Sequence, residues 1–125
     1  MTPLINKLEL DAARAQPFAV IFFSVNWSNF AHQSRATVEN AIALRQAKTS
    51  PERYFVVDVS EQCGELWDAL QEWLQAVEMD NVLTSGSGPL LWLRSGSIVH
   101  QVIDPMNYYP AKISKITETV FQVNP

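Results

Sequence analysis

The sequence is poor in several features on which common functions depend. It has a single cysteine, Cys63, so no disulfide can form within the chain, which agrees with a reducing compartment. Its nine Lys and Arg stand against 13 Asp and Glu, giving a net charge of −4, and no window holds a basic cluster. We therefore do not expect the chain to bind nucleic acid, because the positive footprint of a phosphate-backbone binder is missing.

Long apolar runs are also missing. None approaches the roughly 18 residues that a membrane span requires. The acidic residues Glu9 and Asp11 lie near the start of the chain, where a signal peptide would be apolar. These absences predict a cytoplasmic protein that does not enter a membrane.

What the chain does contain predicts a globular domain. Its 125 residues are 47% hydrophobic and 18% charged, which is too apolar for disorder and less charged than an average globular protein. No internal repeat, low-complexity tract or linker divides it, so we expect one domain over residues 1–125. The low fraction of charged residues predicts that some apolar surface is exposed, which favours binding to a partner.

Two apolar runs organise the fold. Residues 18–25 are rich in β-branched and aromatic side chains without polar alternation, which is typical of a central strand covered on both faces. Residues 54–59 form a second such run, and residues 30–47 between them have an amphipathic, helical pattern. Strand, helix and strand in this order predict a parallel crossover.

The remaining segments complete an α/β pattern. Thr2 and Pro3 suit the start of a first helix of about a dozen residues. Further elements are expected as a helix over 64–77, a β-hairpin over 90–93 and 98–103, and a closing helix over 110–122. The prediction is a three-layer α/β/α sandwich whose mixed central sheet carries a C-terminal hairpin followed by a closing helix.

Two segments carry a resemblance to a known family. Residues 26–42 resemble the thioredoxin stretch in which a Trp precedes Cys-Gly-Pro-Cys and an amphipathic helix follows, with Trp27 at the place of the family's Trp. Gly88 and Pro89, just before the predicted hairpin, are similar to the family's cis-proline segment. The order and spacing of these segments carry the resemblance, which implies a thioredoxin-like fold and a cis peptide bond before Pro89.

The departures from the family concern its chemistry. Ser28 and Ala31 stand where the resemblance places the two cysteines, and Phe22 stands at the position of the family's buried acid. Without either thiol, dithiol–disulfide exchange is not expected. The resemblance therefore assigns neither a catalytic residue nor a cofactor.

Ser28 allows more than one interpretation. It could act as a nucleophile or hydrogen-bond a small thiol ligand, as a serine does in some glutathione-binding relatives of the fold. His32 lies one helical turn later, but no third group is evident to orient its ring. Capping of the helix that follows is favoured, since an N-terminal serine satisfies otherwise unpaired amides.

Cys63 also has two interpretations. It precedes a predicted helix whose dipole could lower the pKa of the thiol and make it reactive, yet Glu61 and Glu65 oppose thiolate formation. An inert thiol is the favoured interpretation. His32 and His100 lack the spacing of metal ligands, so no metal site is predicted.

Two functions from different classes follow. The preferred one is a redox-inactive protein-binding or assembly module that uses the former active-site surface, whose candidate residues are Trp27, Ser28, Asn29, Phe30, Gly88 and Pro89. The alternative is a single-cysteine redox sensor or thiol-ligand-binding enzyme acting through Cys63 or Ser28. Trp67 and Trp73 lie on different sides of their helix, so both are core residues or one adds to an exposed aromatic patch, through which homodimerisation is a third alternative.

Overall fold

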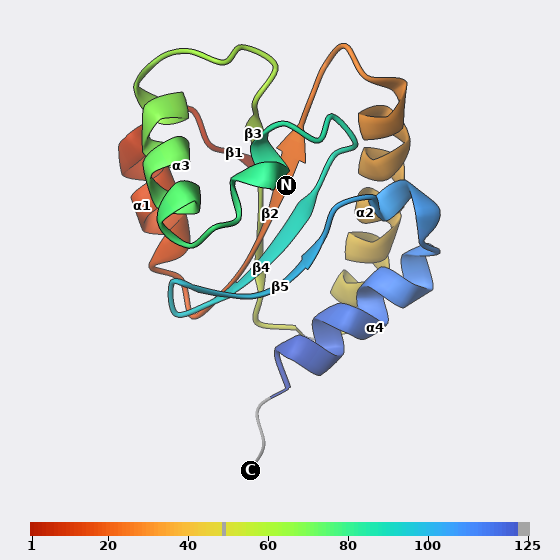
Figure 1. Cartoon of the computed structure of the whole chain (residues 1–125). Coiled ribbons are helices and arrows are strands. Elements are labelled where there is room, and N and C mark those ends of the chain that lie inside the picture. Colours follow the sequence, from red (N-terminus) through yellow and green to blue (C-terminus); the bar gives the residue numbers. More distant parts are fainter. Residues whose placement is uncertain (49, 123–125) are drawn as a thin grey trace.

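The computed structural model describes residues 1–48 and 50–122, in which helices and strands alternate up to a C-terminal hairpin (Figure 1). The strands are β1 (Thr2–Pro3), β2 (Phe18–Ser24), β3 (Arg53–Asp58), β4 (Leu90–Arg94) and β5 (Ser97–Val102). The helices are α1 (Lys7–Arg14), α2 (Asn29–Gln46), α3 (Glu65–Ala76) and α4 (Pro110–Val120), with short 3-10 turns at Asp80–Leu83 and Pro105–Asn107. The order of the main elements after α1 is the predicted one.

The strands form one mixed sheet in the order β1-β3-β2-β4-β5. β3 is parallel to both β1 and β2, whereas β4 is antiparallel to β2 and to β5. The central strand β2 is the apolar run on which the prediction rested, and five of its seven residues are buried. The predicted parallel crossover and C-terminal hairpin are both confirmed.

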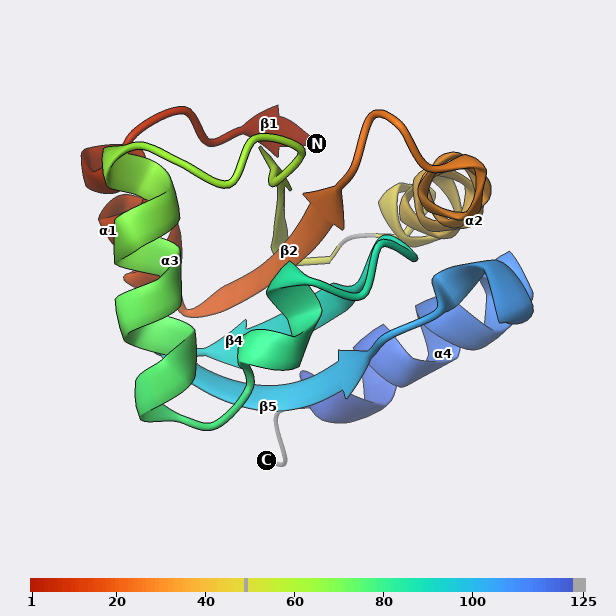
Figure 2. The ribbon, with the colours of Figure 1, turned by 45° about the horizontal axis from the view of Figure 1, so that its top comes forward.

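Helices cover both faces of the sheet, with α1 and α3 on one face and α2 and α4 on the other (Figure 2). Successive residues of β2 serve opposite faces: Ile21 and Phe23 pack in the core under α1 and α3, and Val20 and Phe22 in the core under α2 and α4. This alternation is the ordinary period of a strand. The three-layer α/β/α architecture is therefore confirmed.

The predicted start of the first helix is wrong. Thr2 and Pro3 form the short edge strand β1 beside Phe55 and Val56, and α1 begins only at Lys7. Asn6 caps that helix, since its side chain accepts a hydrogen bond from the Glu9 amide at 2.8 Å. Pairing with β3 outweighs the local helix-start signal, because it supplies backbone hydrogen bonds to a segment that would otherwise lack them.

The two tryptophans of α3 are both core residues. Trp67 and Trp73 are 8% and 7% exposed, and Leu70 and Leu74 between them on the stripe are buried too. The guanidinium group of Arg14 lies 4.3 Å from the centre of the Trp73 ring, a cation–π contact between α1 and α3. Across residues 1–48 and 50–122, no helix combines the length and apolar content needed to cross a membrane.

Candidate functional site

The loop after β2 delivers Ser28 to the start of α2. The Ser28 hydroxyl accepts a hydrogen bond from the Ala31 amide at 3.2 Å and donates one to the Gly86 carbonyl at 2.6 Å. Ser28 is the N-cap residue of α2 and is 6% exposed. The capping interpretation is confirmed, and a hydroxyl that is buried and already donates its proton is poorly placed to act as a nucleophile.

Two further serines tie the same loop to its surroundings. Ser34, fully buried on α2, donates to the Ser87 carbonyl at 2.6 Å and accepts from the Met106 amide at 3.0 Å. Ser87 in turn donates to the Ile103 carbonyl at 2.6 Å. We call Ser28, Ser34 and Ser87 the serine clamp, because their hydroxyls join α2, the loop before β4 and the segment after β5.

The expected cis peptide bond before Pro89 is wrong: the Gly88–Pro89 bond is trans. Gly88 adopts a φ of +73°, a left-handed conformation that turns the chain without a cis bond. A Cβ atom at Gly88 would lie 2.9 Å from the Phe22 ring and 3.0 Å from the Ser34 Cβ. Phe22, at the place of the family's buried acid, therefore packs directly against this glycine.

The six candidate binding residues divide into two groups. Trp27 and Phe30 are 70% and 60% exposed, and Asn29 between them is exposed too. The other three, Ser28, Gly88 and Pro89, are buried. We call Trp27, Asn29 and Phe30 the aromatic surface.

The histidines do not join Ser28 in a catalytic arrangement. His32 Nε2 lies 2.9 Å from the Asn26 carbonyl oxygen. His100, on β5, packs edge-on against Trp92 with ring centres 5.2 Å apart. Within the described part of the chain, His, Cys, Asp and Glu form no group of three that could hold a metal ion.

A cleft of about 560 Å³ opens beside this loop, where the three parallel strands end at their carboxyl termini. Asn26 after β2 and Asp58 at the end of β3 line it, and the Asn26 amide donates to the Ser60 hydroxyl at 2.7 Å. Cys63 is exposed and also lines this carboxyl-edge cleft. The other lining residues are Ile5, Asn6, Ser60, Glu61, Gly64, Glu65, Leu66, Trp67 and Leu70.

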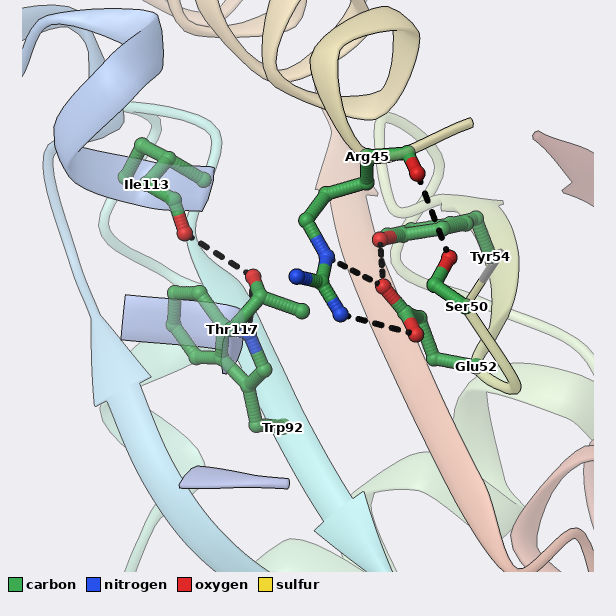
Figure 3. A network of polar contacts seen from close by, with 7 residues as sticks. All are labelled: Arg45, Ser50, Glu52, Tyr54, Trp92, Ile113 and Thr117. Atoms are coloured by element: carbon green, nitrogen blue, oxygen red, sulfur yellow. Dashed lines mark hydrogen bonds and ion pairs between the residues drawn. The ribbon is translucent and has the colours of Figure 1, made fainter. Parts of the chain in front are cut away.

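Sequence reasoning missed a buried ionic cluster at the other end of α2 (Figure 3). Arg45 Nε lies 2.7 Å from Glu52 Oε1 and Arg45 Nη2 3.3 Å from Oε2, while the Tyr54 hydroxyl donates to Glu52 at 2.6 Å. A signal was present, since Arg45 follows Val38 and Ile42 at helical spacing on the buried side of α2. An arginine in an apolar stripe requires a buried partner.

The pKa values within this cluster are shifted. Burial would raise the pKa of Glu52, but hydrogen bonds from Arg45 and Tyr54 outweigh it and hold that pKa below its usual value. Burial, together with the hydrogen bond to Glu52, raises the pKa of Tyr54. The cluster thus holds a carboxylate, a guanidinium and a neutral phenol at neutral pH.

A second buried polar contact anchors the closing helix (Figure 3). The Trp92 indole donates to the Thr117 hydroxyl at 2.9 Å, and that hydroxyl donates to the Ile113 carbonyl at 2.9 Å. The three residues are buried, so each polar atom has a partner inside the core. This contact fixes α4 on the sheet and leaves no group free for chemistry.

Comparison with known proteins finds similar structures but no similar sequence. No family model matches the chain, and no curated protein matches its sequence. A thioredoxin mutant from Halobacterium salinarum superposes with a TM-score of 0.66 at 16% identity, covering 99% of this chain and 93% of that one. Plasmodium falciparum thioredoxin gives 0.65 at 13% identity, covering 95% and 98%. Mitochondrial thioredoxin 3 from Saccharomyces cerevisiae gives 0.62 at 15% identity, covering 95% and 94%.

These structures share the overall fold of this chain. Their sequence identities are too low to carry activity or partners across. The resemblance drawn from residues 26–42 and from Gly88 and Pro89 is confirmed at the level of the fold: this chain has a thioredoxin-like α/β fold, with a five-stranded mixed sheet and four helices among its described residues.

Proposed function

We propose that this chain is a single-domain, cytoplasmic, redox-inactive thioredoxin-like protein that binds a protein partner through the aromatic surface. The observation that carries the proposal is the exposure of Trp27 and Phe30, at 70% and 60%, in a chain that buries its other three tryptophans. Large aromatic side chains are enriched among the residues that dominate binding energy at interfaces. Leaving two such side chains in water within four residues of the chain is otherwise unfavourable.

The contacts that hold the loop around Trp27 in place favour recognition by a preformed site. Ser28 caps α2 and bonds to Gly86, and a Cβ atom at Gly86 would lie 3.4 Å from the Trp27 ring. Ser28 thus holds the loop that carries Trp27, and we infer that the buried residues Gly88 and Pro89 support this loop from the core. A rigid loop loses little conformational entropy when a partner binds.

The absence of dithiol chemistry rests on the sequence. A dithiol exchange within one chain needs two cysteines, and this chain has only Cys63. Ser28 and Ala31, where the resemblance places the thiols, are both buried. The proposed binding needs neither thiol.

Affinity capture from a lysate of the source organism tests the proposal. Wild type is immobilised beside the Trp27→Ala/Phe30→Ala variant and a matched variant, Leu8→Ala/Val77→Ala, which removes two other exposed apolar side chains. We expect a protein that the wild type and the matched variant retain and the aromatic variant loses. Equal capture by all three folded proteins would contradict the proposal.

A second candidate function, a single-cysteine sensor, is favoured by the exposure of Cys63 in the carboxyl-edge cleft. It predicts faster alkylation of Cys63 than of a free model thiol at neutral pH, because reactivity follows the thiolate fraction. Alkylation at the rate of the model thiol or more slowly removes the basis of this candidate. Ser28 gives this second candidate function little support, since its hydroxyl is buried and already hydrogen-bonded.

A further inference from the structure

The carboxyl-edge cleft carries charge of one sign only. Its ionisable carboxyl groups belong to Asp58, Glu61 and Glu65, and no Lys, Arg or His lines it. None of the three takes part in an ion pair with any other residue between 1 and 122 that the structure describes. Their charge is therefore left uncompensated at this edge of the sheet.

Two of the three carboxylates have a role in the local structure. Asp58 accepts a hydrogen bond from the Ser60 amide at 2.8 Å, and Glu65 lies in the first turn of α3, where a carboxylate stabilises the helix. Glu61 has neither role: it is exposed, and its side chain makes no hydrogen bond to the described residues. The combined negative potential remains available to a partner.

The cleft adjoins the aromatic surface. Asn26 lines the cleft and is followed directly by Trp27, and the hydrogen bond between Asn26 and Ser60 joins the two loops. Ile5, 74% exposed, adds an apolar residue on the side of the cleft formed by the segment between β1 and α1. A partner segment that covers Trp27 would also meet the carboxylates.

We propose that the partner binds through a basic segment, in which Lys or Arg side chains enter the carboxyl-edge cleft while a neighbouring apolar side chain packs on Trp27 and Phe30. This inference rests on the proposed function and names the chemistry of its partner. Charge complementarity of this kind steers association and selects among partners. The described residues offer no group of three metal ligands, which favours charges spread along a polypeptide over a single cation. A second copy of this chain, with its net charge of −4, is a poor electrostatic match.

A random-peptide phage library selected on immobilised wild-type protein tests the proposal. We expect the selected peptides to contain more Lys and Arg than Asp and Glu, next to an apolar residue. One selected peptide is then synthesised and titrated against variants. Neutralising Glu61→Gln and Glu65→Gln together should weaken its binding about tenfold, or about threefold for each carboxylate.

Two comparisons make the result specific. The matched variant Glu72→Gln/Glu118→Gln removes the same charge from exposed positions outside the cleft and should leave affinity unchanged. Raising salt from about 0.1 M to about 1 M, which shortens the Debye length from about 10 Å to about 3 Å, should weaken wild-type binding and affect the Glu61→Gln/Glu65→Gln protein less.

The outcomes separate this inference from the proposed function. The inference of a basic segment fails, and the proposed function stands, if the selected peptides need Trp27 and Phe30 but show no basic bias. The same holds if they bind the Glu61→Gln/Glu65→Gln protein as well as wild type. Peptides that ignore Trp27→Ala/Phe30→Ala, or failure to select any peptide, overturn both. A thermal unfolding scan of each variant confirms that the protein used is folded.

Discussion

The two ends of α2 are built in opposite ways. At its start, neutral hydroxyls of the serine clamp bond to backbone atoms, and Trp27 and Phe30 remain in water above them. At its end, Arg45 and Glu52 bury opposite charges against each other, 8% and 6% exposed. The first end combines a hydrogen-bonded loop with exposed aromatic side chains, whereas the second end buries an ion pair.

This difference separates stability from recognition along one helix. A buried ion pair is costly to break, because the remaining partner is left charged without compensation. Exposed aromatic side chains add little to folding, since they are largely solvated in both states. We therefore expect substitutions at the end of α2 to lower the stability of the protein, and substitutions at the aromatic surface to weaken only the binding of its partner.

The largest expected effect comes from Glu52→Ala. It leaves the Arg45 guanidinium buried and unpaired and the Tyr54 hydroxyl without its acceptor. The free energy of unfolding should fall by about 4 kcal/mol, measured by urea denaturation. The exposed pair Arg35 and Glu39 is the matched control: Glu39→Ala should cost less than about 1 kcal/mol. Equal effects would erase the distinction between buried and exposed pairs.

The next largest effect is expected from Gly88→Ala. This substitution should lower the free energy of unfolding by about 3 kcal/mol, because it introduces strain at a positive φ and overpacks the core. The new Cβ would lie 2.9 Å from the Phe22 ring. Gly86→Ala is the control, because its φ is +71° and its nearest neighbour, the exposed Trp27 ring, lies 3.4 Å away. Its loss should be about 1 kcal/mol, and a Gly88→Ala protein as stable as Gly86→Ala would refute the close packing on Phe22.

Ser34→Ala tests the serine clamp itself. Removal of the buried hydroxyl leaves the Met106 amide and the Ser87 carbonyl without that partner. The unfolding free energy should fall by about 2 kcal/mol, and amide hydrogen exchange at Met106 should speed up. Unchanged exchange at Met106 would mean that the hydroxyl does not hold this segment.

The pH dependence of stability should carry a contribution from Glu52. Its pKa is lower in the folded protein than the ordinary 4.5, so its carboxylate adds stability above that pH and loses it as the pH falls through the folded value. The difference in unfolding free energy between wild type and Glu52→Gln should be greatest near neutral pH and shrink below about pH 4. A difference that grows towards acid pH would contradict the assigned direction.

The smallest stability effect is expected at the aromatic surface. Trp27→Ala and Phe30→Ala should each change the unfolding free energy by no more than about 0.5 kcal/mol, because both side chains are mostly in water. Trp67→Ala, which empties a buried site, should cost about 3 kcal/mol or more in the same urea titration. A comparable loss at Trp27 would place that ring in the core.

Local patterns predicted most of the architecture. The apolar run of β2, the amphipathic stripes of α2 and α3 and the hairpin depend on periodicity, which the sequence displays directly. The start of α1 could not be predicted this way, since the pairing of Thr2 and Pro3 with β3 joins segments about fifty residues apart. The trans bond before Pro89 could not be predicted this way either, since tertiary context sets the isomer of an X–Pro bond in an ordered loop.

The candidate site was predicted in part. Ser28 as a cap follows from its place before a helix, and the structure confirms it. The exposure of Trp27 and the burial of Trp67 cannot be predicted from residue type, because both are tryptophans. Ser34 and Arg45 were missed although both are polar residues on the buried side of α2. Their partners lie elsewhere in the chain, and only the folded structure brings them together.

The affinity of a captured partner for the Trp27→Ala/Phe30→Ala protein tests the central claim most directly. Titration calorimetry against wild type and this variant, with the urea midpoint of both recorded, separates binding from folding. We predict a dissociation constant raised tenfold or more, about 1.4 kcal/mol, with the urea midpoint essentially unchanged. An unchanged dissociation constant in a folded variant would contradict the claim that the aromatic surface at the start of α2 is where this protein binds its partner.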